Sequence, residues 1–420
     1  MPSGKLKPLD IGRVTRSQLD DASIRSEIHV DEQGKYVRYG ERAIIERQKS
    51  SNFILFESSP KLWLKEPHKL GLPAAPGLSL TREQLLAGLL ANAFGACIKS
   101  TNTGTATLSR RTISMMDVRV AHPVWPADIE SESNTAIRRI CTQALKMAFE
   151  RDWATVTVTA LQEQTRIPGP AVEALVDVVE PVAAAVELLP STENARRVCA
   201  VIDVGAGTTD IGLFQAVSPD SASTVRGKLY PLGGAVSVFK AGNVIDAIVL
   251  DVLQSRARRT DTIALDDVRS RIRQVKETLF RDGFVQEMGV DLQLDDIQSH
   301  PEAKSMAREI RSEFAMAVER SGNVIFDLMM ARTHYVSRLE LVMAGGGAAI
   351  EFIRKAIEIP LTVSGKELQV RILIAEAEPG IKLFGAGRDR MAVALGGARP
   401  EYDELIHRMP TLNRVSMGPL

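Results

Sequence analysis

A glycine-rich turn between two short apolar runs is the feature that most constrains this chain. It lies within Asp203–Phe214, which reads DVGAGTTDIGLF. The run before it, Val198–Ile202, is rich in β-branched residues, and Ile211–Val217 follows it with the same character. Both runs are typical of buried strands, so the segment predicts a tight β-hairpin.

The composition of this turn is typical of a phosphate site. A tight turn exposes successive backbone N–H groups, which can surround an anion. Gly205 and Gly207 have no side chain, so the backbone can approach a phosphate closely. Asp203 and Asp210 bracket the turn and can hold Mg²⁺ through water, because magnesium tends to keep its hydration shell. The expected phosphate-binding residues are Gly205, Ala206, Gly207, Thr208 and Thr209.

The other common phosphate motifs do not fit the spacing. Gly365 and Lys366 are followed by Glu367 where a P-loop needs a hydroxyl. The pairs Gly205/Gly207 and Gly385/Gly387 lack the third glycine of a dinucleotide fingerprint, and neither lies between a strand and a helix as that fingerprint requires.

Composition narrows the partners and the compartment. The chain has 52 basic and 52 acidic residues, a balance that argues against nucleic acid and anionic membranes as partners. Cys97, Cys141 and Cys199 are far apart in apolar stretches, which predicts buried thiols in a reducing compartment. No apolar run reaches the roughly 18 residues of a membrane span, and the first residues lack a signal-peptide core. We therefore expect a cytoplasmic protein.

Hydrophobic periodicity predicts the other elements. Short strands with turns are expected over 27–45, and alternation at 153–161 predicts another strand. Thr81 and Gln84 form a capping box at the start of a helix that continues to Ile98. Further helices are expected over 137–148, 181–189, 243–253, 265–280, 306–331 and 380–395, and strands over 118–124, 285–294 (a hairpin), 339–343 and 370–375. In both halves strands precede helices, which suggests two related α/β lobes.

Three stretches resemble one protein superfamily, in the right order. DVGAGTTDIG is similar to the second phosphate motif of the actin, hexokinase and heat-shock chaperone superfamily. Leu341–Ile350, LVMAGGGAAI, resembles its adenosine motif, in which glycine backbone lies against the nucleoside. Val179–Ala185, VEPVAAA, resembles the NEPTAAA stretch of the 70-kDa heat-shock chaperones of the DnaK type. Looser matches are Tyr39–Ala43 and Val275–Leu279.

The resemblance implies roles for individual residues. Lys61 falls where these chaperones carry a lysine that reaches the γ-phosphate, and Glu180 would orient a water or the metal shell. Asp203 and Asp210 would organise metal and water, which makes these four residues the expected catalytic group. The nucleoside would lie against Gly345, Gly346, Gly347 and Lys276. The implied ligands are ATP or ADP with Mg²⁺, and the implied partner is a client or co-chaperone protein.

The fold implied by the resemblance is α/β and two-lobed, with ribonuclease-H-like sheets flanked by helices and a nucleotide cleft between the lobes. Lobe I would span 1–194 and be incomplete at its N-terminus. Lobe II would span 195–378, with a helical subdomain at about 240–335. A helix at 379–397 would return to lobe I, followed by a tail at 398–420.

The chain departs from this family at one important place. The family's first phosphate loop, DLGTTNS, has no clear counterpart, and Asp10 in Pro8–Gly12 supplies only a DxG. We therefore expect nucleotide binding with very slow ATP hydrolysis or none. After residue 397 only a short tail follows in this sequence, so we expect no peptide-binding domain. Three alternatives stay open: an actin-like polymerising ATPase or scaffold, a metabolite kinase of the same superfamily, and a nucleotide-sensing pseudo-enzyme.

Overall fold

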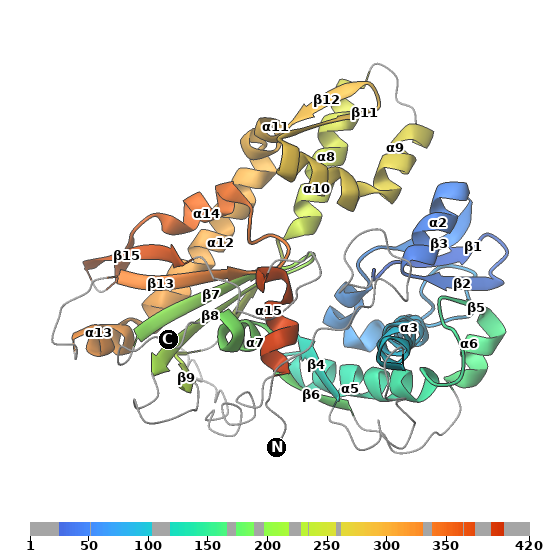
Figure 1. Ribbon diagram of the computed structural model, residues 1–420, viewed down its shortest axis with the longest axis horizontal. Coiled ribbons are helices and arrows are strands. Elements are labelled where there is room, and N and C mark those ends of the chain that lie inside the picture. The colour runs from blue at the N-terminus through green and yellow to red at the C-terminus, as the bar shows by residue number, and fades with distance from the viewer. Residues whose placement is uncertain are drawn as a thin grey trace.

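The computed structural model of the chain describes residues 25–50, 52–102, 118–165, 174–188, 197–217, 228–233, 235–257, 262–330, 338–363, 365–373 and 388–398. This part of the protein is α/β, with parallel and antiparallel strand pairs and helices beside the sheets (Figure 1). None of its helices is both long and apolar enough to cross a membrane. Asp10, Gly385 and Gly387 lie outside the described residues.

A small antiparallel sheet forms the first part of the fold. Its strand order is β3-β1-β2-β5. Buried Ile28, Val30 and Val37 pack from this sheet into one apolar core with the helices around it. The elements of this part are β1 (Ile28–Asp31), β2 (Tyr36–Tyr39), α2 (Glu41–Lys49), β3 (Phe53–Glu57), the 3₁₀ helices η1 (Pro60–Lys65) and η2 (Pro67–Lys69), α3 (Arg82–Asn102), α5 (Glu130–Met147), β5 (Thr155–Thr157) and α6 (Val158–Gln164).

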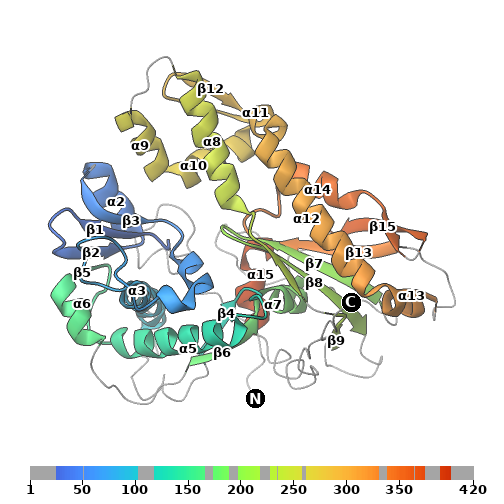
Figure 2. The same ribbon diagram turned by 180° about the vertical axis from the view of Figure 1, so that it is seen from behind.

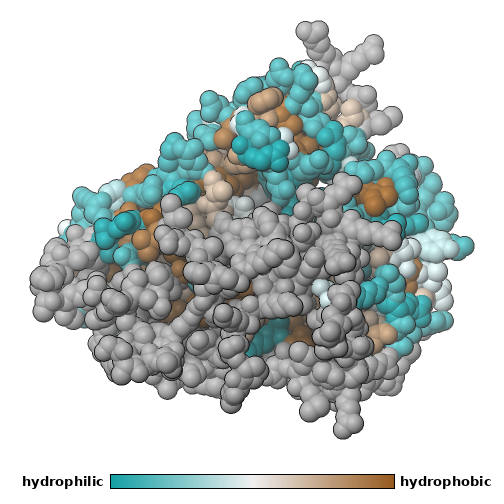
Figure 3. Space-filling view, in the orientation of Figure 1, coloured by the Kyte–Doolittle hydropathy of each residue, from teal (hydrophilic) through white to brown (hydrophobic). Residues whose placement is uncertain are grey.

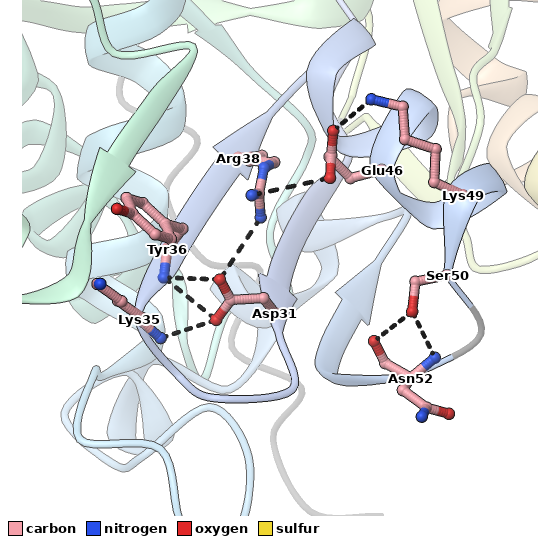
Figure 4. A network of polar contacts seen from close by, with 8 residues as sticks. All are labelled: Asp31, Lys35, Tyr36, Arg38, Glu46, Lys49, Ser50 and Asn52. Carbon is pink, nitrogen blue, oxygen red and sulfur yellow. Dashed lines mark hydrogen bonds and ion pairs between the residues drawn. The ribbon is translucent and has the colours of Figure 1, made fainter.

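A polar network holds the β1–β2 turn and α2 together (Figure 4). Asp31 accepts hydrogen bonds from the backbone N–H groups of Lys35 (2.7 Å) and Tyr36 (3.2 Å). Arg38 lies 3.7 Å from Asp31 and 3.7 Å from Glu46 of α2. The network therefore fixes the helix against the sheet.

The larger sheet is mixed and forms the centre of the second part. Its order is β10-β8-β7-β13-β15-β14, with β9 beside β8. The pairs β7–β13 and β13–β15 are parallel, and the remaining pairs are antiparallel. The strands are β7 (Arg197–Val204), β8 (Thr209–Val217), β9 (Lys228–Pro231), β10 (Val236–Val238), β13 (Arg338–Ala344), β14 (Leu361–Val363) and β15 (Lys366–Leu373).

Helices between β10 and β13 share one apolar core with this sheet. Figures 1 and 2 show α12 running from the upper helical region along the sheet, next to α14. The elements here are α8 (Gly242–Arg256), α9 (Thr262–Ser270), α10 (Ile272–Asp282), β11 (Phe284–Glu287), β12 (Val290–Gln293), α11 (Leu294–Ser299), α12 (Pro301–Arg320), α13 (Gly322–Met330) and α14 (Glu351–Glu358). Most of the coloured surface over this region in Figure 3 is hydrophilic, with small apolar patches.

A third unit lies between these parts in Figure 1. The parallel pair β4 (Val118–His122) and β6 (Ala174–Val179) carries α7 (Glu180–Leu188), and α15 (Arg388–Gly397) packs against α7. Small side chains allow the close packing of these two helices, because Ala183, Ala184 and Ala185 are fully buried and Gly397 lies beside Val178.

Four predicted elements differ from the structure. Residues 41–49 form a helix because Gly40, at φ 60°, ends the strand, and Glu41 in the first turn and Lys49 in the last complement the helix dipole. The expected strand at 153–161 becomes α6 at Val158, because the Thr157 hydroxyl accepts a hydrogen bond from Ala160 N (3.2 Å) and caps that helix.

Two long predicted helices are each divided. The helix expected over 265–280 breaks at Arg271, whose side chain makes a bidentate pair with Glu287 of β11. The helix expected over 306–331 breaks at Ser321, whose hydroxyl donates to Leu232 O at 3.1 Å. In both cases a tertiary contact competes with a continuous helical pattern.

Candidate functional site

The site forms where three strand ends of the larger sheet meet. Asp203 near the end of β7 lies directly opposite Asp210 near the start of β8, and on its other side it pairs with Ala344 at the end of β13. The glycine-rich turn follows Asp203 and Gly345 follows Ala344, so the register brings both expected nucleotide motifs together. This confirms the predicted hairpin.

The turn itself is polarised. Gly205 N donates to Thr208 O (2.9 Å), which closes the turn. On one side, the carbonyl groups of Gly205 and Ala206 accept hydrogen bonds from Gly242 N (3.1 Å) and Asn243 N (2.7 Å) at the start of α8. The backbone N–H groups of Ala206, Gly207 and Thr208 donate to no group in the described part of the chain. The turn therefore offers its donors, not its acceptors, to a ligand.

Charged side chains from three other elements converge on the turn. Asp210 is buried and accepts hydrogen bonds from the Thr208 hydroxyl (2.9 Å) and from Val124 N (3.3 Å). Glu180 begins α7, and its carboxylate accepts a short hydrogen bond from Lys61 of η1. Thr209 instead donates its hydroxyl to Lys240 O (2.8 Å), which orients it away from a direct phosphate role. The structure thus brings Lys61, Glu180, Asp203 and Asp210 into one cluster.

The carboxylates carry more negative charge than the cluster balances. Burial, together with the negative charges of Glu180 and Asp210, raises the pKa of Asp203 to about 8. Burial and Glu180 raise the pKa of Asp210 to about 6, against the opposing effects of Lys61 and the Thr208 hydrogen bond. Burial lowers the pKa of Lys61, but the carboxylates of Glu180, Asp210 and Asp203 together outweigh this effect, so the pKa of Lys61 is raised. A further cation would relieve this repulsion.

The donor set fits a hydrated magnesium ion. Among the described residues, no three carboxylate, thiolate or imidazole groups converge closely enough to form a direct metal cage. Asp203 accepts no hydrogen bond from any described residue, so its oxygens can accept from metal-bound water. Asp203 and Asp210 are the residues that would hold the ion, through its water ligands.

The three glycines after β13 do not have one common role. Gly345 has φ +82°, and a Cβ there would collide with Oδ1 of Asp203 and O of Val204. A Cβ at Gly347 would collide with the Val204 side chain, and Gly347 N donates to Val204 O at 2.9 Å. These two glycines are required by packing against β7. Gly346 is exposed, which leaves it able to face a ligand.

Lys276 lies beside the turn but already has protein partners. Its ammonium is 2.5 Å from Asp246 and donates to Gly242 O at 3.2 Å, both on α8. Gly242 in turn lies against Gly205 and Ala206, since a Cβ there would be 3.3 Å from Gly205 O. Lys276 therefore braces the start of α8 against the β7–β8 turn, and its expected nucleoside role stays a prediction.

Sequence reasoning missed three residues that border the turn. A Cβ at Gly207 would lie 2.9 Å from Leu62 Cδ2, so η1 sits directly on the turn. Lys65 of the same 3₁₀ helix lies over the Phe239 ring, 3.7 Å from its centroid. Leu62 and Lys65 are three residues apart, and residues at this spacing share a face of a 3₁₀ helix. The spacing could therefore have indicated that the two side chains lie on the same face.

A comparison with models of protein families finds none that matches this chain, and a comparison with curated proteins finds no relative. The sequence motifs and the geometry of the site are therefore the features that indicate a function.

Proposed function

We propose that this chain is an ATP-binding protein with a two-lobed actin-like fold, similar to the nucleotide-binding domain of the 70-kDa heat-shock chaperones. The observation that carries the proposal is the β7–β8 turn. Its three N–H groups at Ala206–Thr208 have no partner among the described residues, and two buried aspartates bracket them. A triphosphate with its magnesium ion satisfies both the free donors and the surplus carboxylates.

The arrangement of the parts supports the same proposal. The small sheet with η1, the larger sheet with α8, and α7 between them all contribute to one site. In the two-lobed interpretation, the triphosphate would contact both lobes in the cleft between them, and their relative position would depend on it. Such a protein acts as a nucleotide-dependent conformational switch.

Slow hydrolysis is part of the proposal. The sequence has no clear counterpart of the family's first phosphate loop, so the γ-phosphate would be held mainly from the β7–β8 side and its developing charge would be less fully neutralised. Bound Mg²⁺ would neutralise charge on the phosphates and favour ionised Asp203. Lys61 is held by Glu180, so less of its charge is directed at the phosphates. The site is thus better suited to binding nucleotide than to turning it over.

Thermal stability with and without ATP·Mg²⁺ tests the binding proposal. A ligand that binds only the native state adds about RT ln(1 + [L]/Kd) to its stability, so the melting temperature should rise with ATP concentration. Ala206→Pro removes one of the free turn N–H groups and should reduce the rise. Thr362→Ser, at an exposed position of β14 on the far edge of the larger sheet, is the control and should leave the rise unchanged. A folded protein whose melting temperature is unchanged at millimolar ATP would refute the proposal.

Phosphate release tests the slow turnover. We expect a rate well below that of an ordinary chaperone ATPase, and ordinary turnover that is abolished by Asp203→Asn would contradict it.

Sedimentation with and without ATP distinguishes a polymerising actin-like protein, which would grow in mass with ATP. The client or co-chaperone, the cytoplasmic location and the absence of nucleic-acid binding stay predictions from the sequence.

A further inference from the structure

A lysine that no motif identified faces the phosphate turn. Lys65 is half-buried at the end of η1, and it forms no ion pair with any described residue. Its ammonium instead lies 3.7 Å from the centroid of the Phe239 ring. Most other lysines close to the site have a carboxylate partner, such as Glu180 for Lys61 and Asp246 for Lys276. Lys65 therefore holds a positive charge that no described carboxylate neutralises by direct contact.

The position of Lys65 is set from both sides. With three residues per turn, Lys65 lies on the same face of η1 as Leu62, which contacts Gly207 of the turn. Phe239 directly follows Val238, which pairs with Thr209 at the start of β8. Lys65 thus lies between two segments that border the β7–β8 turn: its own 3₁₀ helix, through Leu62, and the segment of Phe239, through Val238.

The electrostatics of Lys65 agree with this position. Burial lowers the pKa of Lys65 to about 8, while the negative charge of Asp210 favours its protonated form and the positive charge of Lys61 opposes it. Lys65 is therefore within electrostatic reach of the carboxylate and the lysine that flank the expected terminal phosphate. A phosphate bound between them would stabilise the charge of Lys65.

We propose that Lys65, held over the Phe239 ring, binds the terminal phosphate of a nucleoside triphosphate at the β7–β8 turn and so distinguishes a triphosphate from a diphosphate. This inference rests on the proposed nucleotide site. Lys61 is engaged by Glu180, so Lys65 supplies the cation that the γ-phosphate needs. The Phe239 ring keeps the ammonium in place by a cation–π contact without neutralising it.

Binding of ATP and of ADP, each with Mg²⁺, is measured by calorimetry for the full chain and four variants. Lys65→Met keeps an apolar contact with Phe239 but removes the charge, and we expect ATP affinity to fall about tenfold while ADP affinity changes less than about threefold. Lys65→Arg retains the charge and stacks on the ring, so it should keep ATP affinity within about threefold. Phe239→Leu should lower ATP affinity by an intermediate factor, again with little effect on ADP.

The matched control is Lys69→Met on η2, because Lys69 pairs with Glu66 away from the turn, and both affinities should be unchanged. Melting temperatures confirm that each variant is folded. If the unaltered protein binds neither nucleotide, the proposed function fails and this inference with it. If it binds both, but Lys65→Met weakens ATP and ADP equally or weakens neither, the inference alone is overturned.

Discussion

At the scale of single residues, the most consequential pair is Asp203 and Asp210, which face each other across one hairpin. Like charges directly opposite in a sheet repel, and burial increases the cost of ionising either one. A fold optimised for stability alone would avoid this pair. The pair lies next to three backbone N–H groups that have no acceptor among the described residues, and such a local conflict is typical of a functional site.

The first prediction concerns Asp203→Asn and pH. The native state raises the pKa of Asp203 to about 8, above its value in the unfolded chain, so the native state binds the proton more tightly. The associated stability is fully present below the unfolded pKa and is lost as pH rises through about 8. Asparagine cannot ionise, so the variant should be more stable than the unaltered protein above pH 8, by an amount on the order of a few kcal/mol.

Urea unfolding between pH 6 and pH 9, without nucleotide, measures this effect. The free energy of unfolding of the unaltered protein should decline across that range, and that of Asp203→Asn should decline less. Asp128→Asn, at an exposed position, should follow the unaltered protein. Parallel curves for the unaltered protein and Asp203→Asn would show that Asp203 is already ionised in the native state.

The second prediction separates the glycines that follow β13. Gly345→Ala places a Cβ against Asp203 and Val204 at a φ of +82°, so it should lower the free energy of unfolding by about 2–3 kcal/mol. Gly346→Val, at an exposed position, should weaken ATP binding more than it weakens folding. Urea unfolding and calorimetric ATP affinity are measured for both variants. Equal losses of stability with unchanged ATP affinity would make all three glycines packing residues.

Individual site residues could be predicted from the sequence where a single local motif contains them. The DVGAGTTDIG motif alone identified Asp203, Asp210 and the turn. Lys65 and Phe239 could not be found in this way, because their contact joins segments distant in the chain and depends on how η1 docks. The split role of Gly345, Gly346 and Gly347 was also hidden, since it depends on the register of β13 against β7.

At the scale of elements, the capping box at the start of α3 is the clearest local device. Thr81 N donates to the Gln84 side chain at 3.0 Å, and Gln84 N donates to the Thr81 hydroxyl at 3.2 Å. The helix carries Leu85, Leu86 and Leu89 into the core of the small-sheet part. The start of this helix was predicted correctly because the box and the apolar periodicity agree.

The third prediction is that Thr81→Ala lowers the free energy of unfolding by about 1 kcal/mol, because it leaves a helix N–H without its acceptor. Thr135→Ala is the matched control, since Thr135 is exposed in the middle of α5 and its hydroxyl bonds to Ser131 O. That substitution should be neutral or slightly stabilising. Chemical denaturation measures both, and a loss of equal size in the two variants would exclude a specific capping effect.

Helix ends set by distant contacts were not predictable at this scale. Apolar periodicity continues through Arg271 and Ser321, but the Glu287 carboxylate and the Leu232 carbonyl bind these two side chains and end the helices there. The prediction of a strand over 153–161 was wrong for the opposite reason. The local cap at Thr157 starts a helix, although the residues that follow alternate between apolar and polar. Hydrophobic periodicity alone therefore does not locate the residue at which a helix ends or at which a strand gives way to a helix.

At the scale of the whole molecule, two of the contacts seen among the described residues join the small-sheet part to the part around the larger sheet. One is made by η1, whose Leu62 lies against Gly207 of the β7–β8 turn and whose Lys65 lies over the Phe239 ring. The other joins two helices, where Arg47 of α2 lies 3.3 Å from Asp266 of α9 in the upper helical region (Figure 1). Arg47 is buried and also lies over the Phe53 ring, so its position is fixed by its own part of the protein.

The fourth prediction is that Asp266→Asn loosens this second contact with little loss of stability. Asp266 is partly exposed, so the ion pair contributes about 1 kcal/mol at most. Spin labels on cysteines placed at the exposed Gln48 and Gln274, in a Cys97→Ala background, should give a longer and broader distance distribution in the variant. Asp267→Asn, on the same helix but paired with Arg271, should leave it unchanged. Identical distributions in all three proteins would show that this ion pair does not restrain the two parts.

The parallel pairing of β7 with β13 has a consequence for the order in which the chain folds. The β7–β8 hairpin closes between neighbouring residues, so it can form as soon as its two strands leave the ribosome. Gly345 and the end of β13 are synthesised only after all the helices from α8 to α13, and their docking on Asp203 closes a very long loop. A nascent chain therefore carries the β7–β8 turn while the 128 residues from 218 to 345 are synthesised, before it acquires the opposite wall of the site. Nucleotide would accordingly act late in biogenesis, by trapping the finished fold and not by guiding its early steps.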